Sequence, residues 1–88
     1  MWKFLDGYFI STADTFDKGL ETMVFPSKKD ARTVESIFGD VYVIGVDFGN
    51  PCDEYTRHYE TVEDAKQGHK KTVELVKQVI KEKGGEND

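Results

Sequence analysis

Three side chains in this sequence are of the kinds that bind transition metals or act as nucleophiles: Cys52, His58 and His69. Zinc sites need several converging ligands, and two of these normally stand close together at C-x2-C or H-x3-H spacing. No two of the three residues have that spacing, and Asp53 or Glu54 would have to supply an oxygen ligand. The pattern favours a lone thiol and two unrelated imidazoles. We therefore expect neither a metal nor another cofactor.

Nucleophilic catalysis would need Cys52, Ser11 or Ser36 beside a base and an acid that orients the base. These candidates lie in separate parts of the chain, and the sequence contains no G-x-S-x-G motif. Its glycines do not assemble into a Walker or dinucleotide-binding fingerprint either. The sequence therefore predicts a protein that is not an enzyme.

His69 differs from the other imidazole because it falls on the apolar side of a predicted helix, one turn from Ala65 and from Val73. Burial there would lower the pKa of the ring. The pattern favours a core histidine bonded to a sheet carbonyl or a tyrosine hydroxyl. The alternative is a ligand pocket at Gly68 and His69, because a residue without a side chain lets a ligand come close. Close packing of the helix on a sheet explains Gly68 equally well.

The helix that carries both residues is predicted over residues 61–83 and is the strongest pattern in the chain. Thr61 is a good N-cap, and the acids Glu63 and Asp64 favour the positive end of the helix dipole. The apolar stripe comprises Ala65, His69, Thr72, Val73, Val76, Val79 and Ile80, with Val62 joining it and Leu75 at its border. A glycine pair is expected to stop the helix and to leave residues 84–88 as a frayed acidic tail.

Runs of β-branched and aromatic residues predict four strands, over residues 4–13, 20–25, 41–48 and 54–60. In the second strand, Leu20, Thr22 and Val24 share one face because side chains alternate along a strand. The third run is almost continuously apolar, which is typical of a central strand. The fourth alternates polar and aromatic residues, as an edge strand does.

A second helix is predicted over residues 27–38. Ser27 and Asp30 resemble a capping box, and Gly39 stands where a left-handed C-cap would be needed. The residues at helical spacing are Ala31, Val34, Ile37 and Phe38. Pro26 is expected to end the preceding strand. The predicted fold is therefore α+β in ββαββα order, with a small antiparallel sheet of about four strands packed against the long C-terminal helix.

Composition supports one small globular domain, over residues 1–83 of the 88. The chain is 38% hydrophobic and 33% charged, and its net charge of −5 argues against direct nucleic-acid binding. It has no long apolar stretch and no signal-peptide pattern at its start, so we expect no membrane contact and a cytoplasmic location. Cys52 is the single cysteine, which excludes an internal disulfide and fits a reducing compartment.

The charges are unevenly distributed along the sequence. Residues 62–83 hold six lysines against four acids, whereas the acids dominate before them. The sequence thus predicts an acidic, tyrosine-bearing surface that could bind a basic protein, comprising Tyr42, Asp47, Asp53, Glu54, Tyr55 and Tyr59. A solvated surface with no partner is the alternative. The predicted edge strand over residues 54–60 could also pair across the two-fold axis of a homodimer.

The chain contains LETMVF at residues 20–25 and YETVEDAKQGH at residues 59–69. These segments match an ETMVF strand and a Y-x-T-x-E-E-A-x-x-G-H helix start, and in this they resemble small uncharacterised proteins of phages and prophages. Asp64 stands in place of the second glutamate of that pattern. The resemblance implies a phage-related origin and no known catalytic residues. Small phage proteins without enzymatic motifs often bind and disable a host factor, including host defence proteins.

The sequence thus leads to two main hypotheses of different classes. The first is a non-enzymatic, phage-encoded protein that binds and modulates a host or phage protein, as an anti-defence inhibitor would. The second is a small-ligand binder that sequesters a nucleotide-type signal near Gly68 and His69. A small enzyme ranks last.

Overall fold

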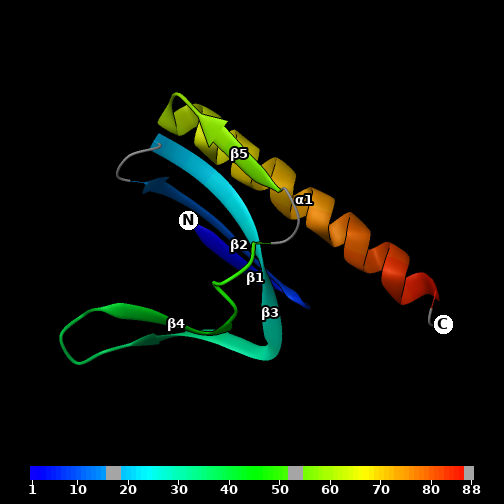
Figure 1. Ribbon diagram of the computed structural model, residues 1–88, viewed down its shortest axis with the longest axis horizontal. Helices are drawn as coiled ribbons and strands as arrows, with labels where there is room; N and C mark the ends of the chain where they lie inside the picture. Colours follow the sequence, from blue (N-terminus) through cyan, green and yellow to red (C-terminus); the bar gives the residue numbers. More distant parts are fainter. Residues whose placement is uncertain (16–18, 52–54, 87–88) are drawn as a thin grey trace.

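The computed structural model describes residues 1–15, 19–51 and 55–86 of the chain. These residues form five strands and one helix (Figure 1). The elements are β1 (Trp2–Leu5), β2 (Tyr8–Thr15), β3 (Gly19–Glu35), β4 (Val41–Val46), β5 (Thr56–Tyr59) and α1 (Val62–Glu86). The helix lies along one face of a curled antiparallel sheet, so the predicted α+β class is confirmed.

The sheet depends on β3, which is much longer than its neighbours. Its first half pairs with β2 on one side and with β5 on the other, and β1 extends the sheet beyond β2. Its second half pairs only with β4. Figure 1 shows this second half turning away from α1, so that β4 and its loop project from the body of the molecule. β5 is an edge strand, as predicted.

The predicted strand over residues 4–13 is wrong in one respect, because it is two strands joined by a tight turn. β1 and β2 form a hairpin in which Leu5 pairs with Tyr8. Asp6 and Gly7 make the turn, with Gly7 at a φ of 84°. An Asp-Gly pair between apolar runs is a strong hairpin signal, because both turn positions tolerate positive φ.

The helix predicted over residues 27–38 is wrong, because β3 continues through Glu35. Thr33 and Val34 are β-branched and pair with Val43 and Tyr42 of β4, which supplies a ladder of backbone hydrogen bonds. Gly39 does adopt a positive φ, 87°, but in the β3–β4 hairpin turn and not at a helix end. The ββαββα order is therefore replaced by five strands followed by one helix.

Two related predictions about this region are also corrected. Pro26 does not end its strand: it pairs with Tyr8 of β2, and on the other side of β3 it lies between the β5 pairing, which stops at Met23, and the β4 pairing, which starts at Ser27. A residue without an N–H is tolerated in a strand where one side of the ladder is interrupted. The strand predicted as central, β4, is an edge strand that pairs with β3 alone. Its apolar residues are therefore largely exposed.

The core lies between α1 and the sheet. Ile10 of β2 and Val24 of β3 are buried against Val76 of the helix. Thr22 is fully buried on the same face as Val24, which confirms the predicted alternation along β3. The opposite face of the sheet carries a cluster of rings from Phe4, Phe9, Phe25 and Phe48, with neighbouring centroids 4.8 to 6.2 Å apart.

The helix begins as predicted. The Thr61 hydroxyl accepts a hydrogen bond from the Asp64 backbone N–H, 3.1 Å away, which is the N-cap geometry. Ala65, Thr72 and Val76 of the predicted stripe are buried. Val62 and Leu75 are 59% and 47% exposed, so the buried stripe is narrower than the sequence suggests. Helical structure extends to Glu86, so the glycine pair at 84–85 falls inside the last turn.

Two valines of the same helix test this packing. Val76→Ala should lower the free energy of unfolding by about 2 kcal/mol, because Val76 is only 6% exposed and its removal leaves a cavity. Val62→Ala, at a 59% exposed position, should change it by less than about 0.5 kcal/mol. Urea unfolding followed by circular dichroism measures both. An equal loss of unfolding free energy in the two variants would contradict the observed orientation of the helix.

Candidate functional site

His69 belongs to a chain of polar groups between the helix and the sheet. Its Nδ1 lies 2.7 Å from the Thr12 hydroxyl, which lies 2.5 Å from the Thr22 hydroxyl. Both threonines are buried. A threonine hydroxyl can donate to one of these partners and accept from the other. His69 is therefore bonded within the helix–sheet interface, to a threonine where the sequence suggested a sheet carbonyl or a tyrosine.

The surroundings of His69 favour its neutral form. The pKa of the ring lies below its ordinary value of 6.5, first because burial disfavours the charged imidazolium and second because the positively charged Met1 amine is near. That amine donates to the Thr12 carbonyl oxygen, 2.9 Å away. A neutral ring keeps one nitrogen free to accept a hydrogen bond from a hydroxyl. His69 thus works as a structural group at neutral pH.

Gly68 is the point of closest approach between the helix and β5. A Cβ placed there would overlap the phenol ring of Tyr59. The Tyr59 hydroxyl is buried and has no hydrogen-bond partner among the described residues. The packing of Tyr59 on the bare backbone is therefore a sufficient reason for glycine at position 68.

Tyr55 is tied to the helix one turn further along. The Thr72 hydroxyl donates to the Gly68 carbonyl oxygen, 2.8 Å away, so its single proton is used. The Tyr55 hydroxyl, 2.9 Å from the Thr72 hydroxyl, must then donate to it. Tyr55 and Tyr59 were both predicted on a protein-binding surface; the structure places them half-buried on the helix-facing side of the sheet edge.

Two cavities flank this edge. One has a volume of about 520 Å³ and lies between β5 and α1. Its lining comprises Tyr55, Arg57, Tyr59, Asp64, Gln67, Gly68, Lys71, Thr72 and Leu75. Of the predicted ligand-binding pair, Gly68 lines this cavity, whereas His69 is held at the core side of the helix by Thr12.

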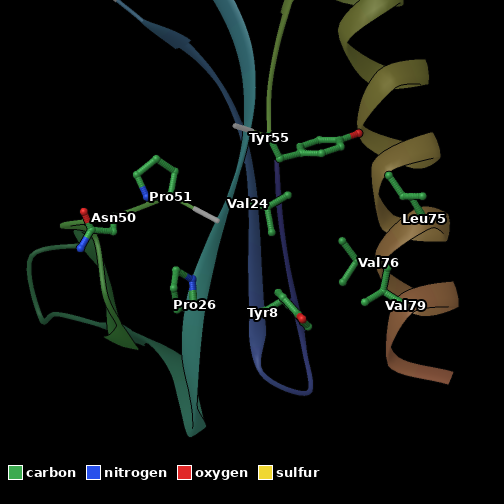
Figure 2. Close-up of a pocket in the computed structure, with 9 residues that line it drawn as sticks. All are labelled: Tyr8, Val24, Pro26, Asn50, Pro51, Tyr55, Leu75, Val76 and Val79. Atoms are coloured by element: carbon green, nitrogen blue, oxygen red, sulfur yellow. The ribbon is translucent and has the colours of Figure 1, made fainter. Parts of the chain in front are cut away.

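The other cavity, of about 430 Å³, is largely apolar and is drawn in Figure 2. Its lining comprises Tyr8, Val24, Pro26, Asn50, Pro51, Tyr55, Leu75, Val76 and Val79. Figure 2 shows Tyr55 reaching from the sheet edge towards the helix, above Val24 and Val76. Tyr55 and Leu75 line both cavities and so separate them.

A third feature is the projecting hairpin, residues 33–47, which we call the arm. Ile37 and Phe38 at its turn are 94% and 85% exposed. Four more apolar side chains are exposed along its strands: Val34, Val41, Tyr42 and Ile44. The Ser36 hydroxyl accepts hydrogen bonds from the Phe38 and Asp40 N–H groups, which holds the turn in one shape.

The remaining predicted residues are dispersed. Tyr42 lies on the arm, and Asp47 lies at its end, where its carboxylate accepts a hydrogen bond from the Gly49 N–H. Asp53 and Glu54 lie outside the described residues, as does Cys52. Within the described ranges no three histidine, cysteine, aspartate or glutamate side chains form a metal-binding group.

No hydrogen bond in the described ranges joins the other chemistry-bearing candidates to one another. His58 lies 3.4 Å from the Glu21 carboxylate, on the face of the sheet opposite to the helix. Ser11 is in β2, paired with Met23, and Ser36 is in the hairpin turn. The two serines and the two histidines are thus not brought together.

Sequence reasoning missed the arm because its apolar residues also have helical spacing. A usable signal was present: the β-branched residues Thr33 and Val34 precede Gly39, and the run rich in β-branched residues at 41–46 follows it, as in two strands of a hairpin. The cavity next to Gly68 was anticipated only in part. Arg57 and Lys71 come from different elements, and only the packing of β5 on α1 brings them to one cavity.

Comparison of the chain with protein-family models, curated proteins and solved structures finds no match. No helix in the described ranges is long and apolar enough to cross a membrane.

A double-mutant cycle tests the Gly68–Tyr59 contact. Gly68→Ala should lower the free energy of unfolding by about 2 kcal/mol through overpacking, although alanine improves helix propensity by about 1 kcal/mol. In a Tyr59→Ala background the same change should stabilise by about that 1 kcal/mol, because the ring is gone. Urea unfolding of the wild type, the two single variants and the double variant gives the coupling free energy between positions 68 and 59. If Gly68→Ala stabilises both backgrounds, the contact does not exist.

The pKa of His69 predicts how stability depends on pH. Since the folded-state pKa is lowered, the unfolded chain binds the proton first as the pH falls below 6.5. The contribution of neutral His69 to the free energy of unfolding should be fully present above pH 6.5. It should be lost as the pH falls through the folded-state pKa. NMR titration of the His69 ring measures this pKa directly. Urea unfolding at several pH values shows whether the free energy of unfolding falls less steeply with pH in His69→Gln than in the wild type. An NMR titration midpoint at or above pH 6.5 would contradict the lowered pKa of His69.

Proposed function

We propose that this chain is a small non-enzymatic binding protein that uses its arm, residues 33–47, to engage another protein. The observation that carries the proposal is the exposure of six apolar side chains on one projecting hairpin, with Ile37 and Phe38 almost fully in solvent. Isolated exposed apolar residues are ordinary, but a contiguous exposed apolar patch marks an interaction site.

The arm has a shape suited to insertion. Tyr42 lies directly opposite Val34, and Ile44 follows Tyr42 on the same face, so three apolar side chains form one surface. Val41 lies on the other face, opposite Glu35. A two-stranded hairpin exposed on both faces gains little stability by itself. A partner groove that receives the tip and one face would bury these side chains and stabilise the arm.

Charge indicates the chemistry of that partner. Near the tip, Glu35 and Asp40 are acidic and residues 33–46 contain no lysine or arginine, whereas Lys28, Lys29 and Arg32 lie on β3 nearer the base of the hairpin. Acids around an apolar tip fit an apolar groove rimmed with basic residues, and they would speed association by electrostatic steering. We therefore propose a partner protein with a basic rim. A basic partner was also expected from the sequence, for a predicted surface that shares only Tyr42 and Asp47 with the arm.

A second copy of the chain fits the arm less well. Full antiparallel pairing of two β4 strands about a two-fold axis would place Asp40 of one copy opposite Asp47 of the other. Like charges directly opposite each other destabilise a strand pair. This disfavours a homodimer through the arm and favours a different protein.

The biological setting of the proposal rests on the resemblance of residues 20–25 and 59–69 to small phage and prophage proteins. We propose that the chain is phage-encoded and acts in the host cytoplasm, where it binds and modulates a host or phage protein, such as a host defence protein. An arm that inserts an apolar tip into a groove is a simple way to block that groove.

Capture from a bacterial host lysate, followed by measurement with the purified captured protein, tests the proposal. Phe38→Ser and Ile37→Ser should each weaken binding at least about tenfold, because binding energy concentrates in side chains that fill a desolvated pocket at the centre of an interface. Folding should be unaffected, since both side chains are in solvent. Binding should also weaken as the salt concentration rises.

Val62→Ser is the matched control, because Val62 is an exposed apolar residue on the helix, away from the arm. It should leave the affinity unchanged. The proposal fails if the tip variants bind as tightly as the wild type. It also fails if Val62→Ser weakens binding as much as they do.

A further inference from the structure

The cavity between β5 and α1 concentrates positive charge on an acidic protein. Among the described residues, Arg57 of β5 and Lys71 of α1 line it together with one acid, Asp64. The chain as a whole carries a net charge of −5. Within the described ranges neither cation forms an ion pair, although acids outnumber bases in the sequence. The cavity is therefore a local positive site.

The walls of the cavity are suited to a flat ring. Tyr55 and Leu75 form its border with the apolar cavity of Figure 2. The Arg57 guanidinium carbon lies 5.8 Å from the centre of the Tyr55 ring, which keeps the cation beside an aromatic surface. Leu75 is 47% exposed, so a planar group could cover it. Gln67 and Asp64 add hydrogen-bonding groups at the helix end of the cavity.

The number of acceptor oxygens distinguishes between classes of anion. With Asp64 counted, the cavity has a net charge of +1, and its two cations stand on facing elements. A phosphate monoester presents several acceptor oxygens, so Arg57 and Lys71 can each bind a different one, since guanidinium and ammonium groups both bind phosphate oxygens. The volume of about 520 Å³ also exceeds what a bare phosphate ion would fill.

We propose that this cavity binds a phosphate monoester attached to a planar ring, with the phosphate on Arg57 and Lys71 and the ring against Tyr55 and Leu75. Nucleoside monophosphates have this chemistry. The site uses no residue of the arm and is independent of the protein-binding proposal. Gly68 lines the cavity, but its neighbour His69 takes no part, because its Nδ1 is bonded to Thr12.

Isothermal titration calorimetry of the full chain with the 5′-monophosphates of adenosine, guanosine, cytidine and uridine tests the site at low salt. At least one should bind, and the matching nucleoside and inorganic phosphate should each bind about tenfold more weakly or worse, because each supplies half of the contacts. Absence of binding by all four at millimolar concentration overturns the proposal. So does inorganic phosphate binding as tightly as the best nucleotide.

Matched charge variants identify the place of binding. Arg57→Gln and Lys71→Gln should each weaken the nucleotide about tenfold, since each removes a charged hydrogen bond. Lys70→Gln removes the same charge from the neighbouring position, which does not line the cavity, and should retain the affinity. Equal weakening by Lys70→Gln and Lys71→Gln would overturn the assignment. Phe38→Ser should not alter nucleotide binding, which separates this result from the test of the arm.

Discussion

The continuous pairing of β3 is the constraint on which the rest of the structure depends. Its first half is sandwiched between β2 and β5 and carries the residues that face the helix, whereas its second half leaves the sheet and pairs with β4 alone. One strand thus joins a packed body to a projecting arm. At Pro26 the strand stays paired with Tyr8 of β2, while on its other side the β5 pairing has ended and the β4 pairing has not begun.

The body is held by an interface that is apolar at one end and polar at the other. Ile10, Val24 and Val76 form the apolar part, and the hydroxyl pair of Thr12 and Thr22 with His69 forms the polar part. Buried hydroxyls are costly unless they are bonded, so these contacts favour one alignment of α1 on the sheet over a slide along it. That alignment in turn positions Gly68 under Tyr59 and opens the cavity beside Arg57.

The two proposed binding surfaces would bind their partners through different kinds of interaction. The arm offers an apolar, acid-flanked tip that gains from burial against another protein, whereas the β5–α1 cavity offers fixed cations and aromatic walls to a small anion. They share no residue. A protein of this size could therefore respond to a small molecule and to a partner protein through separate elements joined by β3.

The sequence by itself determined the long helix, its Thr61 cap and the alternating faces of residues 20–25, because caps and periodicity depend on residues close together in the chain. Tertiary structure decided the state of residues 27–35. The spacing of Ala31, Val34, Ile37 and Phe38 suits a helix as well as a hairpin, and only pairing with β4 supplies the backbone hydrogen bonds that select the strand. The site was predictable to the same extent. The burial of His69 and the role of Gly68 beside it followed from the helical pattern. The meeting of Arg57 with Lys71, and the choice of Thr12 as the partner of His69, required elements distant in sequence to pack together.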